Sequence, residues 1–366
     1  MTSSIQEISA KHRLSSLRRP ILPFIVKAGL VLVCINGLIL LVVLVGSRML
    51  PSAGAVAFFA NNDATADIYA RDLAGHALIN LTNNNASNDN VAFSPDGQYL
   101  TFTSSSNGGF PQLYLKRVKC SSLFALCNGG LRQLTDITTN TNAGVLFANW
   151  SPNGNQIAYT RGGEIYILNL ETGISDNLTQ NPANDDAPVW SPDGRQIAFS
   201  SQRDSDMAEI YLINSDGSHL QRLTHNDVWD APPIWSPDGT QIAFMSQKGS
   251  GYYLLVLDIR DGSIRDIAPD LENVYNPVWT SKGSQIEFWV GSSQSSSLYT
   301  VDMLQGGTRK LIVSLTGPNQ YFTRMPDGHY LVLHGPNEME STDLYLLDGN
   351  QMRFIADSAG PPVWWP

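Results

Sequence analysis

The sequence predicts an all-β fold, a β-propeller of four-stranded blades, preceded by one transmembrane α-helix. Three observations lead to this prediction. A motif of an aromatic residue followed by Ser-Pro-Asp-Gly recurs along the chain, turn-forming residues are abundant while only 15% of residues are charged, and one long apolar run lies near the N-terminus. Repeats of about 40 to 45 residues with many short strands are typical of propeller blades.

The first element is the apolar run at residues 28–46, which holds no charged residue. At about 1.5 Å per residue it is long enough to cross a hydrocarbon core of roughly 30 Å. Five basic residues precede the run and only Arg48 follows it closely. The positive-inside rule therefore places residues 1–27 in the cytoplasm and the rest of the chain outside it.

We expect a retained single-pass anchor, a short linker at residues 47–54, and an extracytoplasmic propeller at residues 55–366. The alternative is a cleaved signal peptide, with Ala53, Gly54 and Ala55 as the small residues of a cleavage site. Signal peptides usually have apolar regions of roughly 7 to 15 residues, so the longer run favours the anchor.

The charge of the chain is divided unevenly. Six of the 23 basic residues but only one of the 33 acidic residues precede residue 55, so the rest carries a net charge near −15. Nucleic-acid affinity depends largely on Lys and Arg releasing counterions from phosphates. The composition therefore argues against a nucleic-acid partner.

The repeats define the blades. Six copies of the motif begin at positions 93, 150, 190, 235, 279 and 324, as in WSPDGRQIAF at 190–199. In each copy a strand ends at the aromatic residue, and Pro and Gly then favour a tight turn. An alternating strand follows, then a third strand such as EIYLINS at 209–215, a second glycine turn and a short strand that often ends in Leu-Thr.

The two ends of the chain complete one further blade. Residues 55–60 and 67–73 match the second and third strands of a repeat, and residues 361–366 match an opening strand. Pairing of these pieces would close the ring and remove exposed sheet edges. The count is then seven blades, or six if the terminal pieces pair differently.

The motif WSPDG-x-Q-I-A-F, followed by an Ile-Tyr strand and a Leu-Thr ending, resembles the TolB-type (WD40-like) β-propeller repeat family over about residues 55–366. The resemblance implies that one face of the ring and its central channel bind partners. The same repeat occurs in propellers of prolyl-oligopeptidase-type peptidases. Those enzymes need a hydrolase domain with G-x-S-x-G, which this sequence lacks.

The sequence does not predict an enzyme, a metal site or a cofactor. The six histidines are scattered without metal-ligand spacing. The aspartates at 96, 193, 238 and 327 belong to the repeated turn, which explains their presence.

The loops that lead into the opening strands form the predicted binding face, because equivalent positions in a ring lie at one end of it. We select the following residues from these loops: Asp89, Asp185, Asp186, Trp229, Asp230, Tyr275 and Tyr321. Alternatively, Asp and Asn at these positions satisfy backbone groups at the strand ends. Clustered carboxylates also leave calcium as an option.

Cys120 and Cys127 lie in an insertion that lengthens the first repeat interval. Outside the cytoplasm they are candidates for a disulfide that closes a short loop. The spacing alone does not indicate zinc.

Three functions follow as hypotheses. The leading one is a membrane-anchored propeller that binds or scaffolds a protein partner. A second is binding of a glycan or cell-wall ligand, because aromatic rings stack on apolar ligand faces. The third is an enzyme with an unrecognised site in the central channel.

Overall fold

The computed structural model describes residues 28–35, 38–45, 55–62, 65–72, 78–84, 86–106, 109–118, 129–136, 144–226, 228–291, 295–304, 307–316, 319–325, 329–334, 343–348, 351–356, 359 and 363–364. The chain divides into two compact units, Met1–Ser52 and Ala53–Pro366. The expected cytoplasmic segment 1–27 and linker 47–54 lie outside the described residues.

In the first unit, β1 (Ala28–Ile35) and β2 (Leu38–Val45) pair as an antiparallel hairpin. The sequence predicts a transmembrane helix here, and the structure does not show that helix. No helix among the described residues has the length and hydropathy needed to span a bilayer. The local reason is that Val and Ile favour strands and that Asn36-Gly37, between the two strands, is a strong hairpin signal.

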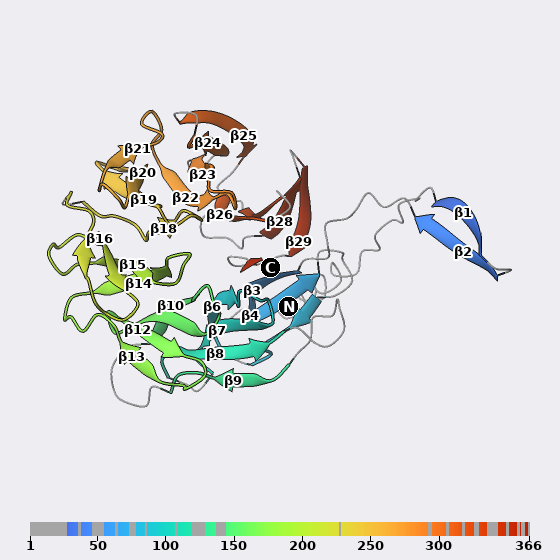
Figure 1. Ribbon diagram of the computed structural model, residues 1–366, viewed down its shortest axis with the longest axis horizontal. Helices are drawn as coiled ribbons and strands as arrows, with labels where there is room; N and C mark the ends of the chain where they lie inside the picture. The colour runs from blue at the N-terminus through green and yellow to red at the C-terminus, as the bar shows by residue number, and fades with distance from the viewer. Residues whose placement is uncertain are drawn as a thin grey trace, which may run out of the picture. The chain divides into compact units, whose positions relative to one another are not determined.

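The second unit consists of seven four-stranded antiparallel sheets, one per blade, as the sequence predicts (Figure 1). Blade one contains β30 (Val363–Trp364), β3 (Ala55–Asn62), β4 (Thr65–Asp72) and β5 (Leu78–Asn80). Blade two contains β6 (Asn88–Phe93), β7 (Tyr99–Ser104), β8 (Gln112–Arg117) and β9 (Leu131–Gln133). Blade three contains β10 (Val145–Trp150), β11 (Gln156–Arg161), β12 (Glu164–Asn169) and β13 (Ser175–Asn177).

Blade four contains β14 (Asp185–Trp190), β15 (Gln196–Ser201), β16 (Glu209–Asn214) and β17 (Gln221–Arg222). Blade five contains β18 (Ile234–Trp235), β19 (Gln241–Lys248), β20 (Gly251–Asp258) and β21 (Ile264–Asp266). Blade six contains β22 (Val274–Trp279), β23 (Gln285–Gly291), β24 (Ser295–Asp302) and β25 (Thr308–Thr316). Blade seven contains β26 (Asn319–Arg324), β27 (Tyr330–His334), β28 (Asp343–Asp348) and β29 (Gln351–Ala356).

Blade one is the split blade that the chain ends predict. The C-terminal strand β30 pairs with β3 through Val56 opposite Trp364 and Ala57 opposite Val363. The ring is thus closed by hydrogen bonds between the two ends of the propeller, which removes two sheet edges.

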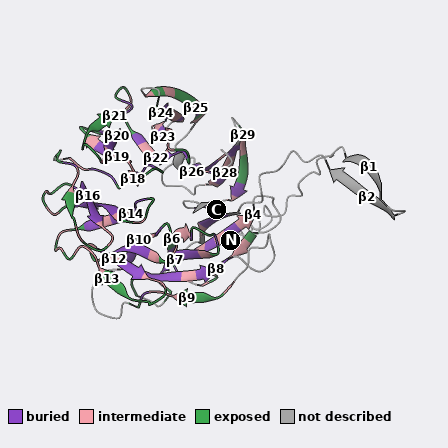
Figure 2. Cartoon of the chain, in the orientation of Figure 1, coloured by how far each residue is buried: buried purple, intermediate pink, exposed green. Residues whose placement is uncertain are grey.

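Apolar clusters lie between neighbouring blades around the whole ring. Each of the seven clusters draws its buried residues from two adjacent blades, including blades seven and one, where Val56 and Phe58 pack with Leu331 and Leu344. Figure 2 shows buried residues in the inner strands and exposed residues in outer strands such as β9 and β25. The core therefore lies between the faces of the blades.

The tryptophan of the repeat motif joins blades four, five and six each to the blade before it. Trp190, Trp235 and Trp279 each donate an indole N–H at 3.2 Å to a carbonyl in the opening strand of the preceding blade. In all three interfaces the Trp packs in the same cluster as an alanine of the preceding blade, as Trp235 does with Ala198. The opening Trp thus connects neighbouring blades through one hydrogen bond and an apolar contact.

Blade seven has Arg324 at the position of this Trp, and blade six has Glu287 at the position of the alanine. Arg324 Nε lies 3.1 Å from a carboxylate oxygen of Glu287, whose side chain is 4% exposed. Burial raises the pKa of Glu287, and burial next to this carboxyl raises the pKa of Tyr330 to about 12. This blade interface therefore has an ion pair where the interfaces of Trp190, Trp235 and Trp279 have an alanine in the cluster of the indole.

Two further motif residues have structural roles. The serine of the turn donates its hydroxyl to the aspartate two residues later, as Ser236 does to Asp238 at 2.6 Å, and the following Gly239 has φ +71°. This hydrogen bond lowers the pKa of Asp238. The turn aspartates 96, 193 and 238 therefore form turns, as the sequence predicts.

Candidate functional site

The opening strands of the blades lie innermost in the ring. Each opening strand is the first member of its sheet, and β6, β10, β14, β18, β22 and β26 contact one another in order around the axis (Figure 1). Residues at the start of these strands therefore approach the axis from several blades. Any ligand that enters the ring along its axis meets them first.

These strands share a bulge near their start. The register of the pair slips between Asp186 and Val189 in blade four, and at the equivalent place in blades two, three and six. The first unpaired residue of each bulge has a positive φ: Asn90 51°, Phe147 45°, Ala187 51° and Asn276 49°. The left-handed region costs a residue such as Phe or Ala about 1–2 kcal/mol, whereas Asn tolerates it.

Strain of this kind often accompanies a functional surface. A bulge also re-aims side chains and leaves backbone groups unpaired. Since four blades carry the bulge at one position, the bulge repeats along the inner wall of the ring. Side chains satisfy several of its backbone groups: Asp89 and Asp186 accept the N–H groups of the residues that follow them, and Asn149 donates to the carbonyl of Pro188.

A cavity of about 500 Å³ lies at this inner wall. Its lining comes from the opening strands of five blades and from β19, and is mainly apolar: Phe147, Asn149, Ala187, Val189, Pro232, Pro233, Ile234, Met245, Asn276, Pro277, Val278 and Phe322. We call this space the axial cavity. Apolar walls with a few polar groups are typical of ligand sites.

The predicted face residues lie at or just before the start of the opening strands, and most have partners within their own blade. Asp185 is fully buried, accepts a hydrogen bond from Ser201 and forms an ion pair with Arg203 at 2.7 Å. The guanidinium of Arg203 lies over the rings of Phe199 and Tyr211. Asp185 therefore ties the opening strand to the second strand.

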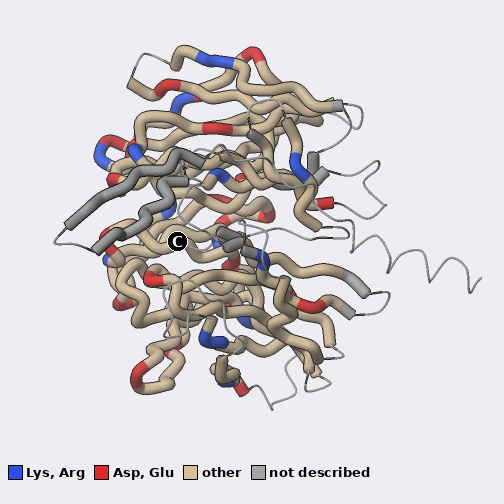
Figure 3. The backbone as a smooth tube through the Cα atoms, turned by 90° about the vertical axis from the view of Figure 1, so that its right-hand side faces the viewer, with Lys and Arg blue, Asp and Glu red and all other residues tan. Residues whose placement is uncertain are grey.

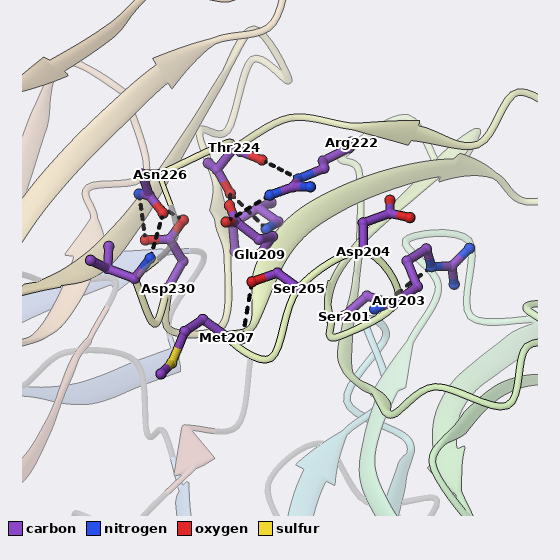
Figure 4. A network of polar contacts seen from close by, with 12 residues as sticks. Ser201, Arg203, Asp204, Ser205, Met207, Glu209, Arg222, Thr224, Asn226 and Asp230 are labelled. Atoms are coloured by element: carbon purple, nitrogen blue, oxygen red, sulfur yellow. Dashed lines mark hydrogen bonds and ion pairs between the residues drawn. The ribbon is translucent and has the colours of Figure 1, made fainter.

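Asp230 belongs to a second buried network, shown in Figure 4. Its carboxylate accepts hydrogen bonds from Ser246 at 2.6 Å and from Asn226 at 3.1 and 3.2 Å. Burial raises its pKa despite these donors. The side chain is fully buried, so a partner at the surface does not contact it directly.

In the same network the Leu-Thr ending has a defined task. Thr224 donates its hydroxyl to Glu209 at 2.6 Å and accepts the backbone N–H of Ile210, while Arg222 pairs with Glu209 at 2.9 Å (Figure 4). Thr82, Thr135 and Thr179 make the same two bonds in blades one, two and three. The Leu-Thr ending thus fastens the outer strand to the start of the third strand.

The other predicted residues are more accessible. Asp89 is exposed, and Asp186 is half-buried with an oxygen accepting the N–H of Ala187. Trp229 is half-buried and packs edge-on against Tyr252, with ring centroids 5.9 Å apart. These three side chains are available to a partner, and their binding role stays a prediction.

Tyr275 is half-buried and donates its hydroxyl to Ser296 at 2.9 Å, and burial raises its pKa. Tyr321 lies in β26, and its side chain is outside the described residues. Cys120 and Cys127 also lie outside the described part of the chain, so the disulfide stays a prediction. Within the described residues no group of three or more His, Cys, Asp or Glu side chains is placed to hold a metal ion.

A larger groove of about 860 Å³ lies between blades two and three at their turn ends. Its wall includes Asp96 and Asn153, and each of these turn residues already accepts a hydrogen bond from the serine of its own turn. The groove thus follows from the spacing of two repeated turns, and we place the candidate site at the axial cavity.

Sequence reasoning selected the polar residues that begin the opening strands and missed the apolar residues that follow them. Phe147, Met245 and Phe322 sit in different sequence contexts, and a linear pattern does not show that they line one space. The available signal was the Pro and Asn at the bulge positions, as in Ala187-Pro188 and Asn276-Pro277, because such residues interrupt a regular strand.

Comparison with known proteins agrees with the repeat pattern. The model of the TolB beta propeller domain matches residues 133–357. A TolB homolog of Chlorobium chlorochromatii is 30% identical over 148 residues, which are 40% of this chain and 31% of that protein. The chain thus matches about a third of the length of this relative.

Two solved structures show the same fold. TolB from Acinetobacter baumannii has 20% sequence identity and a TM-score of 0.53, covering 72% of this chain and 64% of that one. An oligogalacturonate lyase from Vibrio parahaemolyticus has 14% identity and a TM-score of 0.63, covering 84% and 87% of the two chains. The family match spans more than half of the chain, and the chain therefore belongs to the TolB beta propeller domain family.

Proposed function

We propose that this protein is a membrane-anchored, extracytoplasmic propeller that binds a protein partner at the axial cavity, as a binding or scaffolding module without catalytic activity. The observation that carries the proposal is the apolar axial cavity, bordered by strand bulges from several blades. TolB proteins share the fold, and a propeller supports many functions, so the site has to carry the argument.

The chemistry of the cavity suits a polypeptide. Apolar walls from Phe147, Met245 and Phe322 accept an aliphatic or aromatic side chain, and the polar residue Asn276 belongs to the same lining. A cavity of about 500 Å³ holds a few side chains, so the partner inserts a short segment.

The acidic character of the propeller sets a second property of the partner. With a net charge near −15 after residue 54, the domain attracts a basic surface and repels an acidic one. Figure 3 shows that acidic and basic residues are spread over the domain with long uncharged stretches between them. We therefore expect binding to weaken as salt is added, through a lower association rate.

Membrane anchoring rests on residues 28–46. In hydrocarbon every backbone group must be satisfied internally, which a helix achieves and a lone two-stranded hairpin does not. The run is long enough for a helical span and is preceded by basic residues. We expect the helix in the bilayer, with the propeller outside the cytoplasm.

The test is chemical cross-linking in cells, followed by purification of the intact protein and mass spectrometry. Met245→Glu places a charge in the axial cavity, and Leu304→Glu is the matched control, because Leu304 is 81% exposed and follows the far end of β24. The proposal expects one stoichiometric protein partner that is lost with Met245→Glu and kept with Leu304→Glu. Equal recovery of the partner with both variants would show that it does not bind at the axial cavity.

A second pair of variants examines the predicted face. Asp186→Ala and Trp229→Ala alter the accessible face residues without touching the buried Asp185 and Asp230 networks. Loss of the same partner would extend the site from the cavity to the face. A glycan or cell-wall ligand remains the reading to test if purified protein retains carbohydrate and no protein partner.

A further inference from the structure

The outer strand of blade six differs from those of the other blades. The outer strands of blades one to five have two or three residues, whereas β25 has nine, Thr308–Thr316. In Figure 1 it is the long strand at the outside of blade six. Blade six therefore presents the longest sheet edge of the propeller among the described strands.

β25 is the last strand of its sheet, so one side pairs with β24 and the other side faces outward. An outward edge carries rows of N–H and C=O groups that another strand can pair with. Proteins usually blunt such edges with charges, prolines, β-bulges or short length. Residues 311–316, Leu-Ile-Val-Ser-Leu-Thr, contain neither a charge nor a proline. The register of the β24–β25 pair slips once, at Ile312, and residues 313–316 beyond the slip pair in regular register.

The neighbouring long edge is protected in the usual way. β29 in blade seven has six residues with an exposed Arg353 at its middle. Arg71 of blade one also donates a hydrogen bond to the carbonyl of Ile355 in that strand. In β25 the basic residues, Arg309 and Lys310, instead stand at the start of the strand, and the residues after them are uncharged.

The edge of β25 is also held in place. Arg309 makes two contacts of 2.6 Å with the carboxylate of Asp270 in the loop after blade five, which lowers the pKa of Asp270 to about 2. The hydroxyls of Ser297 and Ser314 lie 2.8 Å apart across the β24–β25 pair. A strand fixed in this way loses little further entropy when it pairs.

The charge at the start of β25 indicates which charge a pairing segment should carry there. Arg309 is neutralised by Asp270, while the next residue, Lys310, is exposed and has no ion pair among the described residues. Leu311, 48% exposed, follows it. The edge thus offers one cation followed by six uncharged positions.

We propose that residues 310–316 of β25 accept an extended, β-branched segment of a partner protein as an antiparallel fifth strand of blade six. The segment is uncharged except at its C-terminal end, which lies at Lys310 and carries a carboxylate. A second copy of this chain fits less well, because two propellers with a net charge near −15 repel each other. The surface is separate from the axial cavity, since β25 is the outermost strand and the cavity belongs to the innermost strands.

The experiment uses the full chain in detergent micelles and a fluorescent synthetic peptide, Thr-Val-Ser-Val-Thr-Val-Glu, with a copy N-methylated at alternate residues. Fluorescence anisotropy measures binding. We expect saturable binding of the plain peptide and an affinity at least about tenfold lower for the methylated copy, because it cannot donate the backbone hydrogen bonds. Equal affinities, or no saturable binding of either peptide, overturn the proposal.

A charge exchange locates the site without disturbing the fold. Lys310→Glu should weaken binding of the peptide that ends in Glu and strengthen binding of a peptide with Lys at that end. Arg132→Glu, in the exposed outer strand of blade two, should change neither affinity. Unchanged affinities in Lys310→Glu overturn the proposal. Reversible self-association that Leu311→Lys abolishes would identify a second copy as the occupant and also overturn it.

Discussion

The ion pair between blades six and seven gives a prediction whose size follows from the repeat itself. Glu287→Ala leaves the guanidinium of Arg324 in the interface without its carboxylate. Breaking a buried pair costs about 3–5 kcal/mol when the remaining charge is fully buried. The side chain of Arg324 is 24% exposed and stays partly hydrated, so we expect a smaller loss of stability, about 2–3 kcal/mol.

The double variant Glu287→Ala with Arg324→Trp places an Ala and a Trp in this interface. It thereby copies the pairing that Ala243 and Trp279 make in the neighbouring interface. An apolar replacement of a buried pair is often neutral or stabilising by about 1–4 kcal/mol, so the double variant should be at least as stable as the wild type. Urea unfolding followed by tryptophan fluorescence and circular dichroism gives the free energies, and a double-mutant cycle gives the coupling. The reasoning would be refuted if Glu287→Ala were within about 0.5 kcal/mol of the wild type in stability. It would also be refuted if the double variant lost as much stability as the two single variants together.

Three further predictions concern the hydrogen bonds of Thr224, the buried Asp230 and the closure of the ring by β30. Thr224→Val removes the hydroxyl between Glu209 and Ile210 and should cost about 1–3 kcal/mol in urea unfolding, whereas Thr224→Ser should keep most of the stability. Burial raises the pKa of Asp230, so its contribution to stability is present below its ordinary pKa and is lost as pH rises through the folded value. The urea midpoint of Asp230→Asn should therefore fall less than that of the wild type as pH rises from 4 to 7. Parallel curves of midpoint against pH for the two proteins would contradict the raised pKa. Deletion of residues 363–366 removes β30, and we expect a lower thermal midpoint and faster proteolysis of residues 55–72; unchanged values would show that closure contributes nothing.

The blades could be predicted from the sequence because their cause is local. Pro and Gly at the turn, alternating strands and the fixed order of pieces act within one repeat, and the complementary chain ends specified the split blade that β30 closes. The replacement of Trp and Ala by Arg324 and Glu287 is visible in the motif. Its meaning required knowing that these positions meet across an interface.

The candidate site was harder to predict because it is assembled from many blades. Asp185 begins β14 and Asp230 lies just before β18, close to the predicted entering loops, but their partners Arg203 and Asn226 come from loops whose course the motif does not specify. The apolar cavity residues were overlooked because single apolar residues in strands usually indicate core. The membrane segment has two local readings, a helix that needs a bilayer and a hairpin favoured by Asn36-Gly37.

The central claim is that a protein partner inserts into the axial cavity. The direct measurement replaces Phe147 by the photo-reactive residue p-benzoylphenylalanine and irradiates living cells, with the same residue at the 81% exposed Leu304 as the control. The account predicts one protein adduct from position 147, mapped by mass spectrometry to a short segment of that protein, and no such adduct from position 304. The same adducts from both positions, or none from position 147, would contradict it.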